Sequence, residues 1–589
     1  MKTNNETVKQ KLRTMRHTAE HVLTQAMLSL YPGLKMAMGP ATDEGFYFDF
    51  DYSKKISEED FSKIEAKMQK IIDEDLPLKK EVLSVEKARK LFKGNEYKQK
   101  WLDEIDEKGE KASLYHTGNE FTDLCAGPHI ASTGKIGAFK LLSIAGAYWR
   151  GDEKNKMLTR IYGTAFPTQK ELRVHLARLE KAKKRDHRKL GKELDLFCFS
   201  ELVGSGLPLY TPKGTTIIEE LQKHIEFVCR NYGFGKVMTP HLAKLKLFEL
   251  SGHVQKFNEE IFRVSSLRNH EFALKPVQCP HQTQIYASRP RSYRDLPIRY
   301  MESERQYRAE KSGEVGGLNR VYAITVEDGH SFCRVDQVKD EVKGMVNIIK
   351  DFYTALGLWG NHWVSLSVRD YNHPEKYIGE PKDWDKCEEM LKEVSDEMKL
   401  DAKTCEGEAA LYGPKLDFMF KDALGNEIQI PTVQVDFATP KRFDLTYTNK
   451  SGKKVSPVMV HRAVLGSYER LLALLIEHFA GAFPVWLSPI QVKVLPVTDK
   501  NSKYANQVTR QLSNKNIRVE LDDRNETLQA KIRDAQLQKI PYMLIIGGKE
   551  ENAKKVAVRL RTEKNLGQMS LGKFIERIGR KIDNKSLDL

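Results

Sequence analysis

Two short segments of the chain carry imidazole and thiol side chains at matched spacings. The segment HTAEH places His17 four residues before His21, and the segment DLCAGPH begins at Asp123 and places Cys125 four residues before His129. Residues four apart share one face of a helix, so the first pair can point in one direction. Imidazole and thiolate are ligand types that zinc prefers, and they also transfer protons or activate water. Either pair alone could belong to the surface, but two such pairs favour a metal site or a hydrolytic site.

A second group of candidate residues is cationic. The segment RYMESERQYRAEKSG contains Arg308 and Glu310, Arg320 follows it, and the segment HRAVLGSYER runs from His461 to Arg470. A planar guanidinium can clamp two phosphate or carboxylate oxygens at once. In isolation, each of these arginines would be read as a surface residue.

The composition is that of a globular protein with several domains. The length of 589 residues suggests about four domains, and 40% apolar with 30% charged residues excludes disorder over the whole chain. The 96 Lys and Arg residues outnumber the 81 Asp and Glu residues by 15, which favours a polyanionic partner such as nucleic acid. The chain has no GxxxxGK[ST] loop, no GxGxxG after a strand and no HExxH helix, so a nucleotide would need a different scaffold.

The cysteines and the apolar segments indicate a cytoplasmic protein. Seven cysteines are scattered without a CxxC pair, which argues against a disulfide framework and for a reducing compartment. The N-terminal residues have no apolar segment of the signal-peptide kind. The most apolar stretch, residues 471–487, contains Glu477 and His478 and is too short to span a bilayer.

The elements that must position these residues change character along the chain. Residues 11–31 and 57–75 have helical periods, and FYFDF at 46–50 alternates as a strand does. Residues 168–192 hold ten Lys or Arg against three acids, which predicts a basic connecting helix. That helix is either a solvated face or a surface that lies on phosphates.

The remaining two parts differ in how strands and helices succeed each other. Strand-like runs without βαβ alternation predict an antiparallel sheet with helices in the large central part. Strands and helices do alternate after Pro489, which predicts an α/β domain. The expected boundaries are therefore 1–166, 167–194, 195–488 and 489–589.

The N-terminal motifs resemble those of a known family. HTAEH and FTDLCAGPH, followed by SIAGAYWRGDEKNKMLTRIYGTAF, are similar to the editing domain of threonyl-tRNA synthetases, which is related to that of alanyl-tRNA synthetases. The resemblance implies an α+β domain that hydrolyses mischarged seryl-tRNA, and in the alanyl branch similar sites bind zinc. The implied editing residues are His17, His21, Lys98, Asp123, Cys125 and His129.

The cationic segments resemble the motifs of class II synthetases. The resemblance implies an antiparallel-sheet catalytic core in which Arg308, Arg470 and Glu310 are catalytic and the two arginines contact ATP. Pro240 matches motif 1, which forms the homodimer interface in that family. The implied substrate-binding residues are Asp328, Tyr412, Lys415, Gln434 and Arg320.

Cys279 in LKPVQCP matches, together with His330 and His461, the zinc site of the same family. The three lie 51 and 131 residues apart, so only the resemblance joins them. Three protein ligands leave positions on zinc that the amino and hydroxyl groups of threonine can fill, and valine has no hydroxyl. Serine lacks only one methyl group, worth about 1–3 kcal/mol, so it is admitted and a second, hydrolytic site is needed.

The chain departs from the family pattern at several positions. QYRAEKSG stands where the family has CHRNEPSG, and CPHQ stands where it has CPGH. Ile324 and Val326 occupy positions at which the family has an aromatic residue and a glutamine. These departures keep one alternative open, a tRNA- or mRNA-binding or editing-only paralogue that does not activate an amino acid.

The C-terminal part resembles the anticodon-binding domain of the family. Asn525, Arg533, Glu550 and Arg559 match positions that read anticodon bases, whose Watson–Crick edges are exposed in an unstacked loop. The resemblance covers about residues 12–585 and implies a cytoplasmic threonyl-tRNA synthetase without the ubiquitin-like domain often found before the editing domain. It implies ATP with Mg²⁺, threonine and threonine tRNA as substrates, one Zn²⁺ per catalytic site, a homodimer and no membrane.

Overall fold

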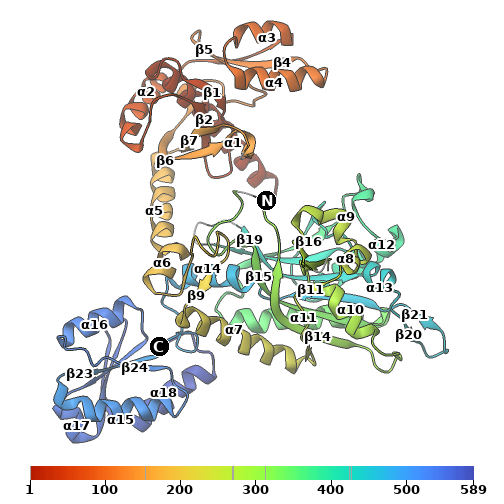
Figure 1. Cartoon of the computed structure of the whole chain (residues 1–589). Helices are drawn as coiled ribbons and strands as arrows, with labels where there is room; N and C mark the ends of the chain where they lie inside the picture. Colours follow the sequence, from red (N-terminus) through yellow and green to blue (C-terminus); the bar gives the residue numbers. More distant parts are fainter. Residues whose placement is uncertain (1, 153, 268–270, 312, 423–424, 426) are drawn as a thin grey trace. The chain divides into compact units, whose positions relative to one another are not determined.

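The structure, a computed structural model, describes residues 2–152, 154–267, 271–311, 313–422, 425 and 427–589 of the chain. It divides into two compact units, residues 1–180 and residues 181–589 (Figure 1). The paired His and Cys segments belong to the first unit, and the cationic segments belong to the second.

The first unit is built on a four-stranded antiparallel sheet. Its strands, in order across the sheet, are β1 (Lys35–Met38), β2 (Phe46–Asp51), β7 (Met157–Phe166) and β6 (Ala138–Tyr148). Its two main helices are α1 (Lys2–Leu30) and α2 (Phe61–Asp73). Phe46 and Phe48 of β2 pack in one core with Leu23 of α1. This packing fixes the rotation of α1 about its axis, and with it the direction of His17 and His21.

A smaller antiparallel sheet in the same unit carries the other half of the N-terminal motif. Its strands and helices are β3 (Leu78–Leu83), β4 (Ala112–Thr117), β5 (Phe121–Leu124), α3 (Val85–Leu91) and α4 (Glu96–Glu107). Lys98 lies in the first turn of α4, Asp123 lies on β5, and Cys125 directly follows that strand. The expected α+β fold of this part is confirmed.

The basic connecting segment forms two helices where one was expected. They are α5 (Gln169–Arg185) and α6 (His187–Glu193), separated at Asp186. The Asp186 carboxylate accepts a hydrogen bond from the Arg188 N–H at 2.8 Å, which starts a new helix. His187 is buried, with Nδ1 2.8 Å from Glu477 and Nε2 accepting from the Leu318 N–H at 3.1 Å. These contacts hold α6 in place within the second unit.

An eight-stranded sheet forms the centre of the second unit. In order across the sheet the strands are β10 (Gly235–Lys236), β14 (Ile298–Tyr307), β15 (Ala323–Cys333), β22 (Val458–Ala463), β19 (Glu427–Asp436), β18 (Lys415–Lys421), β16 (His362–Val368) and β17 (Lys403–Glu406). The inner pairs are antiparallel, and only the outermost pair at each edge is parallel. The expected antiparallel core is confirmed.

Long helices cover one face of this sheet and form the largest core. They are α7 (Pro212–Asn231), α11 (Val338–Ala355) and α14 (Tyr468–Phe479) (Figure 1). Val433 and Val435 of β19 and Val460 of β22 point into this core. Successive strand residues alternate between the two faces, so Gln434 and His461 lie on the opposite face.

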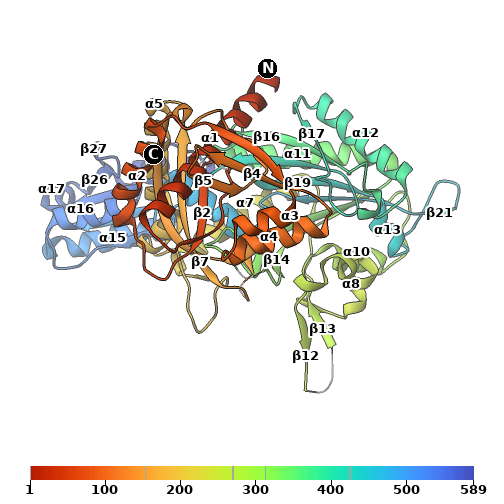
Figure 2. The ribbon, with the colours of Figure 1, turned by 90° about the horizontal axis from the view of Figure 1, so that it is seen from above.

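Shorter elements lie around the opposite face. They are α8 (Leu245–Ser251), α9 (His253–Phe257), α10 (Cys279–Ala287) and α13 (Ala438–Arg442), with a small sheet of β11 (Leu242–Ala243), β13 (Glu271–Leu274) and β12 (Arg263–Ser265) and a hairpin of β20 (Tyr447–Thr448) and β21 (Lys454–Val455). Helix α12 (Pro381–Glu397) instead packs against α11, and its Leu391 and Val394 belong to the largest core. Helices α8 and α10 lie side by side (Figures 1 and 2).

Arg462 and Glu327 form a buried ion pair on the helix-covered face. Arg462 donates two hydrogen bonds to Glu327, at 2.6 and 2.8 Å, and its guanidinium lies 4.5 Å from the ring centroid of Phe234. Arg462 is fully buried and Glu327 is 1% exposed. We expect Arg462→Met to lower the free energy of unfolding by about 3–5 kcal/mol, because it leaves the Glu327 carboxylate buried without a partner. Urea unfolding of the second unit measures this loss.

A double variant provides the control for this prediction. Arg462→Met combined with Glu327→Leu removes both charges, so it should regain most of the lost stability. Equal destabilisation by the single and the double variant would contradict the role given to the ion pair.

The C-terminal part is an α/β domain, as expected. Its sheet has the order β24 (Val519–Leu521), β23 (Val492–Pro496), β25 (Tyr542–Ile546), β26 (Lys555–Leu560) and β27 (Asn565–Ser570), and its helices are α15 (Ser502–Ser513), α16 (Leu528–Leu537), α17 (Gly548–Ala553) and α18 (Leu571–Asp583). The first three strands are parallel and the last two pair in antiparallel fashion. Within the ranges described, no helix combines the length and the apolar character that crossing a bilayer requires.

Candidate functional site

The register of the central sheet brings four of the predicted residues into one row. Across neighbouring strands, His330 of β15 pairs with His461 of β22, His461 pairs with Gln434 of β19, and Gln434 pairs with Lys415 of β18. Residues that pair directly share one face of a sheet. Asp328 lies two residues before His330 and therefore on the same face.

Cys279 completes the predicted metal set from outside the sheet. It is the first residue of α10, and its sulfur and the ring nitrogens of His330 and His461 all lie within 4.8 Å of one another. The three side chains are between 0% and 7% exposed. Burial raises the pKa of the Cys279 thiol, and Tyr412 hydrogen-bonds to it. The three residues thus form one closed cluster of soft and borderline ligands.

Neighbouring side chains determine which nitrogen of each histidine is free. His330 donates from Nδ1 to the Gln282 Oε1 at 2.8 Å, and its buried Nε2 has no hydrogen-bond partner in the described ranges. His461 donates from Nε2 to Asp436 at 3.0 Å, which leaves Nδ1 as the acceptor. Two imidazole lone pairs and one thiol therefore converge. Such a set fits zinc, whose histidine ligands are usually held through the other ring nitrogen.

Asp436 has two tasks at this cluster. Its Oδ2 accepts from His461, and its Oδ1 accepts from the backbone N–H groups of Ala438 and Thr439 at 2.7 and 2.8 Å. The start of α13 and the orientation of His461 thus depend on one buried carboxylate. Neither Asp436 nor Gln282 was predicted, although Asp436 follows Gln434 by two residues, the spacing of one sheet face.

The other predicted substrate-binding residues border the cluster. Asp328 lies 3.7 Å from the Nε2 of His330, and burial raises its pKa to about 7. The centroids of the Tyr412 and His461 rings are 5.3 Å apart. Lys415 pairs with Asp417 at 2.6 Å, and Gln434 donates to the Gly413 carbonyl at 3.4 Å. Asp417, which was not predicted, also accepts from Gln429 and Thr432, at 2.6 and 2.7 Å.

The predicted arginines are grouped at the end of the same sheet. Arg308 directly follows β14, and Arg470 lies in the first turn of α14. Arg320 donates to Glu310 at 2.7 Å and to Glu314 at 2.7 Å. Burial lowers the pKa of Arg470, and the nearby charges of Arg308 and Arg320 lower it further. Three guanidinium groups that repel one another indicate a site for an anion with several charges.

The paired His and Cys segments meet in the first unit. Potential ligand atoms of His17, His21, Cys125 and His129 all lie within 4.8 Å of one another. The Cys125 sulfur is 3.4 Å from the Nε2 of His17 and 3.3 Å from the Nε2 of His129. His17 donates from Nδ1 to the Pro128 carbonyl at 3.3 Å. The Nε2 of His17 therefore carries a lone pair, and the Cys125 thiol lies next to it.

Burial keeps the members of this cluster uncharged. It lowers the pKa values of His17 and His21 and raises the pKa of Cys125 to about 12. Lys98 and Asp123 supply the charges nearby as a buried pair 2.5 Å apart. Neutral imidazoles can take a proton from water, and the Lys98–Asp123 pair can bind hydroxyl or ammonium groups, so this arrangement suits hydrolysis.

Glu20 is a buried acid that the sequence reasoning missed. It is 2% exposed, accepts a hydrogen bond from Thr24 at 2.7 Å, and has a pKa raised by burial and by the charge of Asp123. It lies inside the HTAEH motif, in the part of α1 whose other residues are buried. A lone acid on the buried part of a helix was the signal that could have identified it.

The four predicted anticodon residues lie on different elements. Asn525 precedes α16, Arg533 lies on α16, Glu550 on α17 and Arg559 on β26. Glu550 accepts from the Gly547 N–H at 3.0 Å and from Gln568 at 2.5 Å. In the described part of the chain no hydrogen bond or ion pair joins two of the four.

Comparisons with protein families match most of the chain in three segments. Residues 112–162 match a domain described as the threonyl and alanyl tRNA synthetase second additional domain. Residues 262–479 match the tRNA synthetase class II core domain (G, H, P, S and T), and residues 491–581 match an anticodon binding domain. These segments contain the three groups of candidate residues, apart from His17, His21 and Lys98.

Curated relatives are similar over nearly their whole length. The threonine–tRNA ligase of Rubrobacter xylanophilus is 47% identical over 96% of this chain and 88% of its own, and that of Clostridium tetani is 46% identical over 98% and 89%. A solved structure described as the RNA binding domain of threonyl-tRNA synthetase from Cryptosporidium parvum is 35% identical, with a TM-score of 0.63 over 67% of this chain and 98% of that one. A prolyl-tRNA synthetase from Giardia lamblia, 15% identical with a TM-score of 0.54 over 70% and 82% of the two chains, shares the fold.

Proposed function

Because this chain belongs to the threonine–tRNA ligase family of class II aminoacyl-tRNA synthetases, we propose that Cys279, His330 and His461 hold one zinc ion in its catalytic site. The enzyme joins threonine to threonine tRNA with ATP and Mg²⁺, and it carries an editing domain. The observation that carries the zinc proposal is the buried Nε2 of His330, which has no hydrogen-bond partner among the described residues. It belongs to a cluster in which ligand atoms of Cys279, His330 and His461 lie within 4.8 Å of one another. Zinc bound there would supply Lewis-acid contacts to the amino and hydroxyl groups of threonine.

The protein's own residues would perform the positioning in the first reaction. A carboxylate oxygen of threonine attacks the α-phosphorus of ATP, and the bond to pyrophosphate breaks. Arg308, Arg470 and Arg320 would neutralise the phosphates, and Glu310 would hold Arg320 in place. Asp328, Tyr412, Lys415 and Gln434 would line the threonine pocket. The 3′-hydroxyl of the tRNA then takes the threonyl group, and AMP leaves.

Amino-acid-dependent ATP–pyrophosphate exchange tests this proposal. We expect exchange with threonine, weaker exchange with serine, and none with valine, which has no hydroxyl to present to the site. A zinc chelator should abolish the exchange, and added zinc should restore it. Equal exchange with threonine and valine, or exchange that survives complete removal of zinc, would contradict the proposed site.

We infer that the cluster of the first unit hydrolyses seryl-tRNA through His17. Water attacks the ester carbon, and its proton passes to the Nε2 of His17. The ester bond then breaks, and His17 gives this proton to the ribose oxygen. The Pro128 carbonyl holds His17 in the tautomer that leaves this nitrogen free. His21, Cys125 and His129 would surround the water, and Lys98 with Asp123 would bind the seryl group.

The contacts with tRNA are also a proposal, based on the resemblance of the C-terminal domain to anticodon-binding domains. Asn525, Arg533, Glu550 and Arg559 would contact anticodon bases. The Arg533 side chain is 75% exposed and lies 4.0 Å from the Asp534 carboxylate. The cytoplasm is the proposed location, because all seven cysteines are unpaired, as expected in a reducing compartment.

A homodimer is proposed through the segment around Pro240. Two large apolar side chains precede Pro240 in the sequence, Phe227 of α7 at 63% and Met238 at 82% exposure. Exposed apolar groups of this kind mark protein interfaces. We expect Met238→Lys to weaken dimerisation at least about tenfold, since it places a charge in the interface. Sedimentation velocity over a concentration series measures this change, with the exposed Met157→Lys as the control, and an unchanged dimer would contradict the proposed surface.

A further inference from the structure

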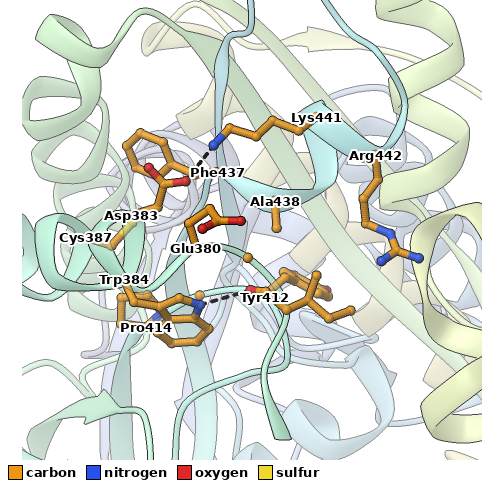
Figure 3. A pocket seen from close by; sticks show the side chains of 13 residues that line it. Glu380, Asp383, Trp384, Cys387, Tyr412, Pro414, Phe437, Ala438, Lys441 and Arg442 are labelled. Atoms are coloured by element: carbon orange, nitrogen blue, oxygen red, sulfur yellow. Dashed lines mark hydrogen bonds and ion pairs between the residues drawn. The ribbon is translucent and has the colours of Figure 1, made fainter. Parts of the chain in front are cut away.

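A cavity of about 150 Å³ lies beside the metal cluster without including its residues (Figure 3). Three segments line it, namely residues 378–387 at the start of α12, residues 412–414 before β18, and residues 437–442 around α13. Cys279, His330 and His461 are not among the lining residues. The cavity therefore lies outside the metal cluster and adjoins the proposed threonine pocket at Tyr412.

The inner wall of the cavity is apolar. Trp384, Cys387 and Phe437 contribute to it, and Trp384 and Cys387 are only 5% and 3% exposed. The indole N–H of Trp384 donates to the Ile378 carbonyl at 2.9 Å, so its polar atom is already satisfied. An apolar cavity of this volume is large enough for a body the size of a benzene ring. A branched aliphatic group of similar size fits the same space.

Some of the charged side chains around the cavity form an ion pair, and others do not. Asp383 pairs with Lys441 at 2.5 Å. The Glu380 carboxylate, drawn in the middle of Figure 3, has no hydrogen bond or ion pair within the described ranges. Among the residues that the structure describes, Arg442 donates only to main-chain carbonyls, those of Leu250 at 2.6 Å and Glu249 at 3.4 Å. Within the described part of the chain, the exposed residues Glu380 and Arg442 therefore have no partner of opposite charge.

We propose that this cavity binds a free α-amino acid with a branched aliphatic side chain, such as leucine. Its ammonium group would contact Glu380, its carboxylate would contact Arg442, and its side chain would lie between Trp384 and Phe437. The pairing of a free anion with a free cation favours a zwitterion over a simple amine, which would leave the guanidinium unmatched. This is a second amino-acid site, beyond the one that selects threonine.

Two residues that line the cavity also lie next to groups of the metal cluster. Tyr412 lines the cavity, and the centroid of its ring lies 5.3 Å from that of the His461 ring. Ala438 also lines the cavity, and its N–H binds Asp436, which orients His461. A ligand between α12 and α13 would therefore contact the groups that position a residue of the catalytic site.

Calorimetric binding to the whole enzyme, with the catalytic site filled by a non-hydrolysable threonyl-adenylate analogue, tests the proposal. We expect leucine to bind. 3-Methylbutylamine lacks the carboxylate of leucine, and 4-methylpentanoate lacks its ammonium group, so each should bind at least about tenfold more weakly. No binding of leucine up to millimolar concentration would overturn the proposal. Equally tight binding of the amine would overturn the amino-acid assignment.

A pair of glutamate variants locates the binding. Glu380→Gln should weaken leucine binding at least about tenfold, because it removes the partner of the ammonium group. Glu375→Gln is the matched control, since Glu375 lies in the same loop, pairs with His373 at 3.3 Å and does not line the cavity. Equal affinity of the two variants would overturn the site. Because the catalytic site is filled throughout, failure here leaves the proposed threonine site untouched, and pyrophosphate exchange tests that site separately.

Discussion

Cys279→Ala is expected to abolish threonine-dependent pyrophosphate exchange and to remove the zinc of the catalytic site. Replacing residues that merely orient metal ligands costs roughly 10–100-fold in affinity or activity, and losing a ligand should cost more. Exchange kinetics and the metal content of the purified protein, measured together, test this expectation. An alanine variant that keeps both its zinc and its exchange activity would show that Cys279 is not a ligand.

Two further variants make this result specific. Cys333→Ala removes another buried thiol, on the same strand as His330, and should leave zinc content and exchange nearly unchanged. Asp436→Asn keeps all three ligands but weakens the hold on His461 and should lower exchange roughly 10–100-fold. An effect of Asp436→Asn as large as that of Cys279→Ala would indicate that the fold around α13 had failed.

His17→Gln is expected to lower the hydrolysis of seryl-tRNA by about 10²–10⁴-fold, the range for loss of a general base. Threonine-dependent exchange should not change, because His17 belongs to the other unit. Single-turnover deacylation of preformed seryl-tRNA measures the effect. His116→Gln is the control, since His116 pairs with Glu81 and Thr122 at 2.8 Å and lies outside the cluster.

The pH dependence of editing provides a second check. His17 accepts a proton only when its imidazole is neutral, and burial lowers its pKa from the ordinary 6.5. The charged form therefore becomes dominant only below that pH. Deacylation should stay constant from about pH 8 down to pH 6.5 and fall only in more acidic solution. A midpoint above pH 6.5 would contradict His17 as the base.

The fold class could be predicted because its signals are local. Alternating aromatic residues at 46–50 and the succession of strands and helices after Pro489 predict elements that the structure contains. The sequence did not reveal β27, because only Leu566 and Met569 in this short strand pack against the core. The break between α5 and α6 was also missed, since it depends on one hydrogen bond of Asp186.

The candidate sites were predictable only where a motif is compact or a family resemblance supplies the link. His17 and His21 stand four apart, whereas His330 and His461 meet through strand pairing that no spacing reveals. Gln282 and Asp436 were missed for a related reason. Their role is to hold another side chain, and that contact exists only once the strands and α10 are in place.

The single row of Lys415, Gln434, His461 and His330 has a consequence for folding. Shifting any one of these strands by one residue would turn its member of the row toward the apolar core. A sheet assembled with such a slip cannot gather the two histidines beside Cys279. Zinc uptake during refolding would therefore report correct strand alignment, and it should lag behind the appearance of β-structure.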